Sequence, residues 1–183
     1  MRYMMLIHHD DAALTKAPPS LWGEYAAFND ALAKAGPRGP MSGVNPAEFP
    51  GIVIDDSEAQ KDGKWTAGTG LPGFYGYGYL YAGADSGAQI VFEYTPEAAG
   101  KFDLRLAYLS HENRGTAVPV TVAQGNSVTK HSIDMTKPAP LDHALLSLGT
   151  FQFDAGTPIR VTLGTEGAQG NAHADAVQFL PVP

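Results

Sequence analysis

The stretch KFDLRLAY, residues 101–108, places a large apolar side chain at every second position. Successive side chains of a β-strand point to opposite faces of a sheet, so this spacing predicts a strand with one buried face. The apolar members are Phe102, Leu104, Leu106 and Tyr108. Asp103 and Arg105 fall on the opposite face, which indicates a half-buried strand of an antiparallel sheet.

The same two-residue period recurs from residue 51 onward, most clearly in PIRVTLG, residues 158–164. Turn-rich segments such as GADSGA and DAGTP separate the periodic stretches. The other predicted strands are GIVID (51–55), the tyrosine-rich stretch up to residue 82, AQIVFEY (88–94), AVPVTVA (117–123), SVTKHSID (127–134), LSLGTFQF (146–153) and HADAVQFL (173–180). About nine strands at roughly ten-residue spacing predict an all-β fold, an antiparallel β-sandwich or jelly roll, over residues 51–183.

The first 50 residues follow a different pattern. RYMMLI, residues 2–7, is typical of a short buried strand, and the apolar residues that follow recur at spacings of three and four, which predicts a helix. These apolar residues are Leu21, Tyr25, Phe28, Leu32 and Ala35. We therefore expect a β-α segment over residues 1–36 and a linker rich in glycine and proline over residues 37–50.

Composition excludes several classes of protein. The formal net charge is −7 and no cluster of lysines and arginines occurs, so we expect no nucleic-acid partner. The chain has no cysteine, which excludes disulfides, thiolate metal sites and thiol nucleophiles. The apolar run Tyr3–Ile7 is too short for a signal peptide or a membrane span, and we expect neither in this sequence.

Motifs of catalytic sites are also missing from the sequence. It contains no Gly-x-Ser-x-Gly elbow, no phosphate-binding loop and no His-Glu-x-x-His zinc motif. A pair of carboxylates from distant strands, as glycosidases use, is an arrangement that motif spacing does not address. Short strands and tight turns leave little room for a deep cleft, so we predict a module that is not an enzyme, with no catalytic residue.

Several motifs follow one another in an order that resembles a known family. They are IVIDDS (52–57), GKWTAGTGLPGFYGYGYLYA (63–82), GKFDLRLAY (100–108), NRGTAVPVTV (113–122), LSLGTFQF (146–153) and ADAVQFL (174–180). Over residues 51–181 this order resembles the golvesin C-terminal-like domain, also called the xanthan-lyase-type module. The resemblance implies a β-sandwich carried by larger secreted bacterial proteins, without catalytic activity and associated with carbohydrate.

Residues 1–36 resemble the opening of a YCII-related domain, a small α+β fold that begins with a strand like MRYMMLI. The resemblance implies a small enzyme or sensor that uses His8, His9 and Asp10. The remaining strands and second helix of such a domain have no place before the linker, so we expect a truncated half-domain.

The tyrosine-rich stretch contains the first candidate binding residues. Tyr75, Tyr77, Tyr79 and Tyr81 share one parity, and in an extended strand they would lie on one face. Such rings bind sugars by stacking, or they fill the gap between two sheets. We predict that Tyr79 and Tyr81 belong to the core, and that Trp65, Tyr75 and Tyr77, nearer the loop, bind a ligand.

A polar loop provides the second group of candidates. SHENRG, residues 110–115, follows the strong strand and offers His111, Asn113 and Arg114 to the hydroxyls or the carboxylate of a sugar. The alternative is that Asn113 and Arg114 fix the loop by bonding to backbone carbonyls.

A metal site is the third candidate. If Val177 and Phe179 face the core, Asp175 shares their face and needs partners for a buried carboxylate. Either backbone amides of the first strand supply them, or a structural calcium ion does, held together with Asp55 and Asp56.

The leading hypothesis is a non-catalytic β-sandwich module that binds carbohydrate or another extracellular polymer. The alternatives are a structural or adhesive module that docks onto polypeptide partners, and a small YCII-like enzyme or sensor.

Overall fold

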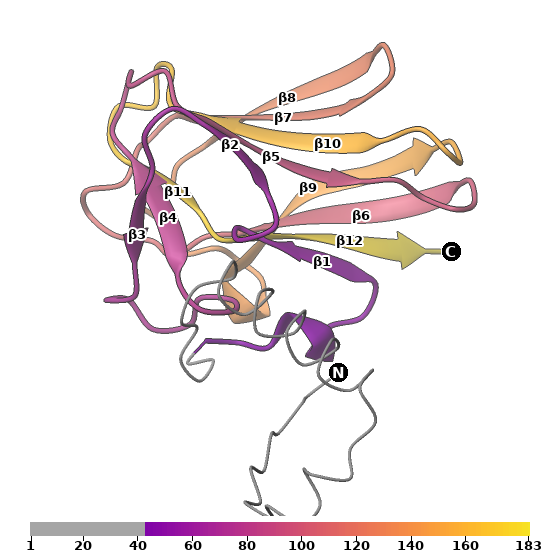
Figure 1. Ribbon diagram of the computed structural model, residues 1–183, viewed down its shortest axis with the longest axis horizontal. Helices are drawn as coiled ribbons and strands as arrows, with labels where there is room; N and C mark the ends of the chain where they lie inside the picture. The colour runs from indigo at the N-terminus through magenta and orange to yellow at the C-terminus, as the bar shows by residue number, and fades with distance from the viewer. Residues whose placement is uncertain (1–42) are drawn as a thin grey trace, which may run out of the picture. The chain divides into compact units, whose positions relative to one another are not determined.

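The structure, a computed structural model, describes residues 43–183 (Figure 1). The predictions made for residues 1–36, including those for His8, His9 and Asp10, lie outside the described residues. Within residues 43–183 the fold is all-β, as predicted, with only two single-turn 3-10 helices, η1 (Pro46–Glu48) and η2 (Asp142–Ala144). No helix in this range could cross a membrane.

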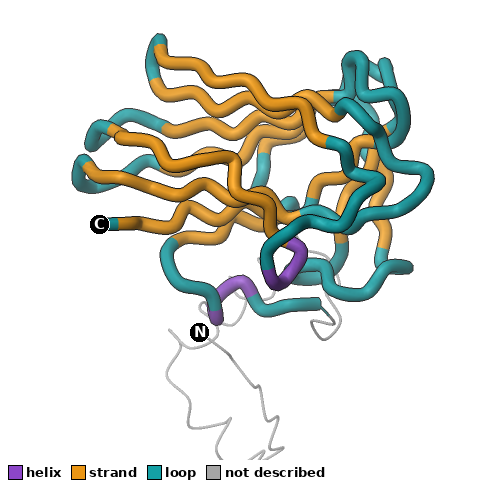
Figure 2. Tube along the Cα trace, turned by 180° about the vertical axis from the view of Figure 1, so that it is seen from behind, coloured by secondary structure: helices purple, strands orange, loops and turns teal. Residues whose placement is uncertain are grey.

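Two antiparallel sheets form the body of the sandwich (Figures 1 and 2). One sheet has the order β1 (Ile52–Asp55), β12 (Ala176–Val182), β6 (Gly100–Ala107) and β9 (Leu145–Phe153). The other has the order β2 (Gln60–Asp62), β5 (Gln89–Tyr94), β10 (Ile159–Gly164), β7 (Val118–Gln124) and β8 (Ser127–Ile133). Eight of the nine stretches predicted as strands contribute to these two sheets, and the tyrosine-rich stretch contributes to a third.

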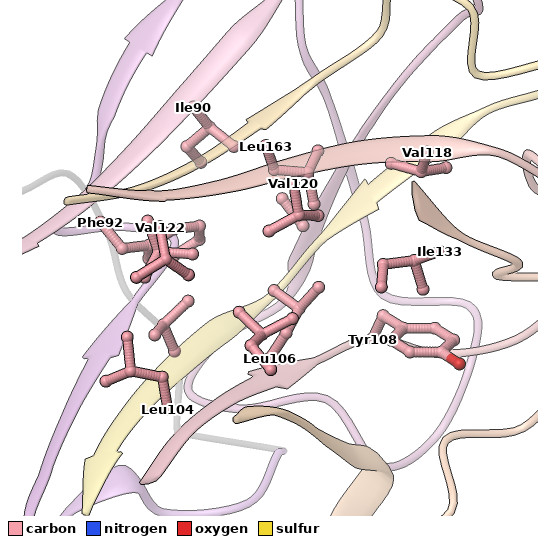
Figure 3. Close-up of a cluster of buried hydrophobic side chains, with 14 of the residues drawn as sticks. Ile90, Phe92, Leu104, Leu106, Tyr108, Val118, Val120, Val122, Ile133 and Leu163 are labelled. Carbon is pink, nitrogen blue, oxygen red and sulfur yellow. The ribbon is translucent and has the colours of Figure 1, made fainter. Parts of the chain in front are cut away.

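The core lies between these two sheets (Figure 3). The apolar face predicted for residues 101–108 is buried throughout, and it faces alternate residues of β5, β7 and β10. Asp103 and Arg105 lie on the other face, where the Arg105 Nε donates to Asp103 Oδ2 at 2.6 Å. The two-residue period thus fixes which side chains enter the core.

A third, smaller sheet lies at the end of the sandwich remote from the C-terminus (Figure 1). It has the order β11 (Ala172–Ala174), β4 (Tyr79–Ala82) and β3 (Thr66–Gly68). The additional strands β2, β3 and β11 raise the number to twelve, where the sequence predicted about nine. Strands of three residues are too short to show a period, and β11 is separated from β12 by Asp175 alone.

Residues 43–50, the described part of the predicted linker, pack on the sandwich. The Val44 N–H donates to the Phe74 carbonyl at 2.6 Å, and the Gly76 N–H donates to the Val44 carbonyl at 2.9 Å. The ring of Phe49 lies 5.1 Å from that of Tyr75. Backbone hydrogen bonds hold much of this segment, so its sequence needs no periodicity.

The single extended strand predicted for Tyr75 to Tyr81 is wrong. Only β4, from Tyr79, is a strand, since Gly76 adopts a left-handed conformation with φ of 62°. The turn separates the rings: Tyr75 is completely buried, whereas Tyr77 is 39% exposed.

Candidate functional site

A shallow pocket of about 300 Å³ opens where the third sheet meets the loop after β6. It is lined by Gly70, Leu71, Tyr79, Tyr81, His111, Asn113 and Arg114. The predicted polar loop and half of the tyrosine-rich stretch therefore meet at one place. Leu71 and the two tyrosines were not predicted as site residues, and only the pairing of β4 with β3 and β11 brings them here.

Backbone hydrogen bonds fix the polar loop. The Arg114 N–H closes a turn on the His111 carbonyl at 3.0 Å. The Asn171 N–H donates to the Asn113 carbonyl at 3.0 Å, and the Gly115 N–H donates to the Asn171 carbonyl at 2.9 Å. The loop is thereby held against the segment that leads into β11, so the pocket is formed before any ligand arrives.

Arg114 lines the pocket and is only 5% exposed. Its guanidinium carbon lies 5.8 Å from the ring centroid of Tyr79 and 5.6 Å from that of Tyr81, within the range of cation–π attraction. Nε donates to the Leu109 carbonyl at 3.5 Å, and Nη1 donates to Asn113 Oδ1 at 3.2 Å. Burial lowers the pKa of Arg114, while Tyr79 and Tyr81 raise it, and the group stays charged.

His173 lies behind the pocket and was assigned no role from the sequence. It pairs with Tyr81 across the small sheet, and its ring stacks on Tyr79 at 4.6 Å. Burial, and then the charge of Arg114, lower the pKa of His173 to about 3, so the imidazole is neutral at physiological pH. Its shared parity with the buried Asp175 is the signal that could have identified it.

The predicted aromatic residues lie outside this pocket. Tyr75 is in the core, where its hydroxyl donates to the His143 carbonyl at 3.3 Å, so its ring is not available on the surface. Trp65 is half-buried against the main core, and its indole N–H donates to the carbonyls of Asp62 at 3.1 Å and Gln89 at 3.2 Å. Tyr77 is exposed away from the pocket. Of the six predicted ligand-binding residues, His111, Asn113 and Arg114 share one pocket, and their role in binding stays a prediction.

Asp175 is fully buried, as predicted from its parity with Val177 and Phe179. Its Oδ1 accepts a hydrogen bond from the Tyr75 N–H at 3.0 Å, a partner in the tyrosine-rich turn rather than in the first strand. Burial raises the pKa of Asp175 well above its usual value, and Asp56 and Asp55 raise it further. The three carboxylates thus lie near one another at the end of the sandwich.

The residues present meet only part of the requirement for calcium. Calcium prefers six to eight oxygen ligands. Asp175 Oδ2 is buried and has no hydrogen-bond partner in residues 43–183, as an ion-facing oxygen would. However, no three acidic or histidine side chains in this range are grouped as metal ligands. The calcium ion remains a prediction, with its test given in the Discussion.

The facing sheets and the polar pocket at their end define an antiparallel β-sandwich module. The model of the Golvesin C-terminal domain family matches residues 52–181, and the chain belongs to that family. Over 153 residues it is 29% identical to the xanthan lyase of Bacillus sp. (strain GL1), covering 79% of this chain and 16% of that enzyme.

Solved structures share the fold. A xanthan lyase from Paenibacillus superposes with a TM-score of 0.62 and 25% identity, over 72% of this chain and 13% of that one. A GH26-CBM35 β-(1,4)-mannanase from Podospora anserina superposes with a TM-score of 0.54 and 15% identity, over 72% of this chain and 28% of that one. The chain therefore spans less than a fifth of the length of either xanthan lyase.

Proposed function

We propose that residues 43–183 form a non-catalytic module that binds polysaccharide through the pocket around Arg114. The observation that carries this proposal is the pocket itself, in which a buried guanidinium, two tyrosines, a histidine and an asparagine converge. Such a set offers several donors and acceptors to sugar hydroxyls. Family membership, the xanthan lyase that is similar in sequence and the xanthan lyase that shares the fold support a polysaccharide as the ligand.

The contacts favour recognition by hydrogen bonds over recognition by stacking. The guanidinium of Arg114 covers the rings of Tyr79 and Tyr81, so these faces are occupied by the protein's own cation. A sugar in this pocket would meet the polar edges of Arg114, Asn113 and His111. This arrangement replaces the aromatic platform that the sequence suggested.

Binding without catalysis is supported by the lining of the pocket. Glycoside hydrolysis generally uses two carboxylates that flank the scissile bond. No aspartate or glutamate lines the pocket around Arg114. The net charge of −7 also disfavours a nucleic-acid ligand.

Affinity electrophoresis of the full chain in gels that contain xanthan, β-1,4-mannan or cellulose derivatives tests the proposal. We expect retardation by at least one polysaccharide, and a loss of affinity of about three- to tenfold in His111→Ala and in Asn113→Ala. Glu112→Ala is the matched control, because Glu112 is exposed in the same loop but does not line the pocket. Lack of retardation in every gel, or equal retardation of the pocket variants and the control, would contradict the proposal and favour a structural or adhesive module.

A further inference from the structure

The charge of Arg114 has no counter-charge in the part of the chain that the structure describes. The ion pairs of residues 43–183 join other residues, namely Arg105 to Asp103, Lys137 to Asp134 and Arg160 to Glu93. The partners of Arg114 are a backbone carbonyl, an amide oxygen, two aromatic rings and the side-chain hydrogen bond with Tyr79, and none of them is a carboxylate. Buried charges are ordinarily paired. The pocket therefore lacks a negative charge to balance that of Arg114.

The groups around Arg114 do not supply the missing charge. His173, whose pKa the charge of Arg114 lowers, is buried, stacked on Tyr79 and neutral. The guanidinium lies over the rings of Tyr79 and Tyr81, and Tyr79 also forms a side-chain hydrogen bond with it; these contacts favour its charged form. No acidic side chain lines the pocket.

We infer that the pocket selects a sugar unit that carries a carboxylate, such as a uronate, and that Arg114 binds this carboxylate. This inference rests on the proposed function and adds the chemical class of the ligand. The planar guanidinium presents its N–H donors as a fork that matches the two oxygens of a carboxylate. A low-polarity surrounding strengthens that contact relative to one on an open surface.

The charge of the whole protein makes this recognition local. With a net charge of −7, the chain repels a polyanion at long range, so a general attraction does not explain binding of an acidic polymer. Selectivity must then come from one carboxylate placed against one arginine. Binding of this kind weakens only modestly with salt, because a partly buried pair is poorly screened.

The matched probes are methyl β-D-glucuronoside and methyl β-D-glucoside, which differ only in a carboxylate against a hydroxymethyl group. NMR titration of the full chain is expected to show at least about tenfold tighter binding of the glucuronoside. Acetate is the third probe, because it carries the carboxylate without the ring. Binding of acetate as tight as that of the glucuronoside would show that the sugar adds nothing, and would count against the proposed function.

Asn113→Asp is the decisive variant. Asn113 Oδ1 already accepts from Arg114 Nη1 at 3.2 Å, so this change of one atom places a carboxylate on the guanidinium without altering shape. We expect the preference for the glucuronoside over the glucoside to fall from at least about tenfold to about onefold. Glu112→Gln, in the same loop, should leave the preference unchanged.

The outcomes separate the two claims. Equal binding of both glycosides at the pocket, or a preference for the glucuronoside that survives Asn113→Asp, would overturn the role of Arg114 and leave polysaccharide binding intact. Failure of both glycosides to bind would also overturn the inference. Absence of binding to any polymer in the gel experiment would instead remove the proposed function itself.

Discussion

Replacing Gly115 by alanine is expected to destabilise the sandwich by about 2–3 kcal/mol and to abolish polysaccharide binding. A Cβ at this position would lie 2.3 Å from the Ala168 carbonyl oxygen and 2.8 Å from Val118 Cγ2. Neither neighbour is the far end of a flexible side chain, so the backbone that carries Arg114 must move. The hydrogen bond from the Gly115 N–H to the Asn171 carbonyl, which holds the loop, would be lost with that movement.

Urea denaturation and affinity electrophoresis of Gly115→Ala measure the two effects. Gly83→Ala is the control, since nothing lies within 4 Å of a Cβ added at Gly83. The control should unfold and bind as the wild type does. Wild-type affinity in Gly115→Ala would show that the close packing behind Arg114 is not needed for binding.

The fold could be predicted from the sequence because its main strands are long and half-buried. The period of two runs through β10 and through β6 up to Leu106, so the side chains buried between the two sheets are identifiable before the fold is known. The third sheet could not be predicted in this way. Its members β3 and β11 have three residues each, and their pairing depends on contacts with β4 that are distant in sequence.

Only part of the candidate site could be predicted from the sequence. His111, Asn113 and Arg114 are identifiable because a cluster of polar residues at the end of a buried strand has to lie in a loop. Tyr79 is buried in a core cluster and Tyr81 packs against it, as predicted, but Tyr75 was placed wrongly, since parity applies only where the backbone is extended. The left-handed turn at Gly76 buries Tyr75 and exposes Tyr77, and no side-chain pattern reports this turn.

The environment of Arg114 also could not be predicted from the sequence. Whether an arginine in a loop is solvated or buried depends on what packs over it. Here β4, about 35 residues before Arg114 in the sequence, supplies two rings. The segment before β11, about 57 residues after Arg114, supplies the backbone partner. The sequence offered both readings of Arg114, loop anchor and ligand contact, and the structure contains the anchoring bond to the Leu109 carbonyl.

Asp175→Asn is expected to stabilise the protein by about 1–3 kcal/mol at pH 7 in the absence of calcium. Asp175 is buried next to Asp55 and Asp56, and these charges together with burial disfavour its ionised form. The Tyr75 N–H donates to Asp175 Oδ1 at 3.0 Å, and an asparagine oxygen can accept the same hydrogen bond. The substitution therefore removes the charge and keeps the contact.

The pH dependence of this effect has a definite sign. Because the folded-state pKa of Asp175 is raised above 3.8, its protonated form stabilises the fold below that pH, and this contribution is lost as the pH rises through the folded-state pKa. The advantage of Asp175→Asn should therefore be small near pH 3.8 and grow toward neutrality. Thermal unfolding between pH 4 and pH 8 in the presence of EDTA measures it, and a constant difference across this range would contradict the raised pKa.

Calcium reverses the expected sign if Asp175, Asp55 and Asp56 hold this ion. A bound cation would favour the ionised carboxylate and stabilise the folded state by mass action, so millimolar calcium should raise the Tm of the wild type. Asp175→Asn would lose that gain and become the less stable of the two proteins. Equal Tm values of the wild type with calcium and with EDTA would instead leave Asp175 as a buried acid that the fold tolerates at a cost, with the Tyr75 amide as its partner.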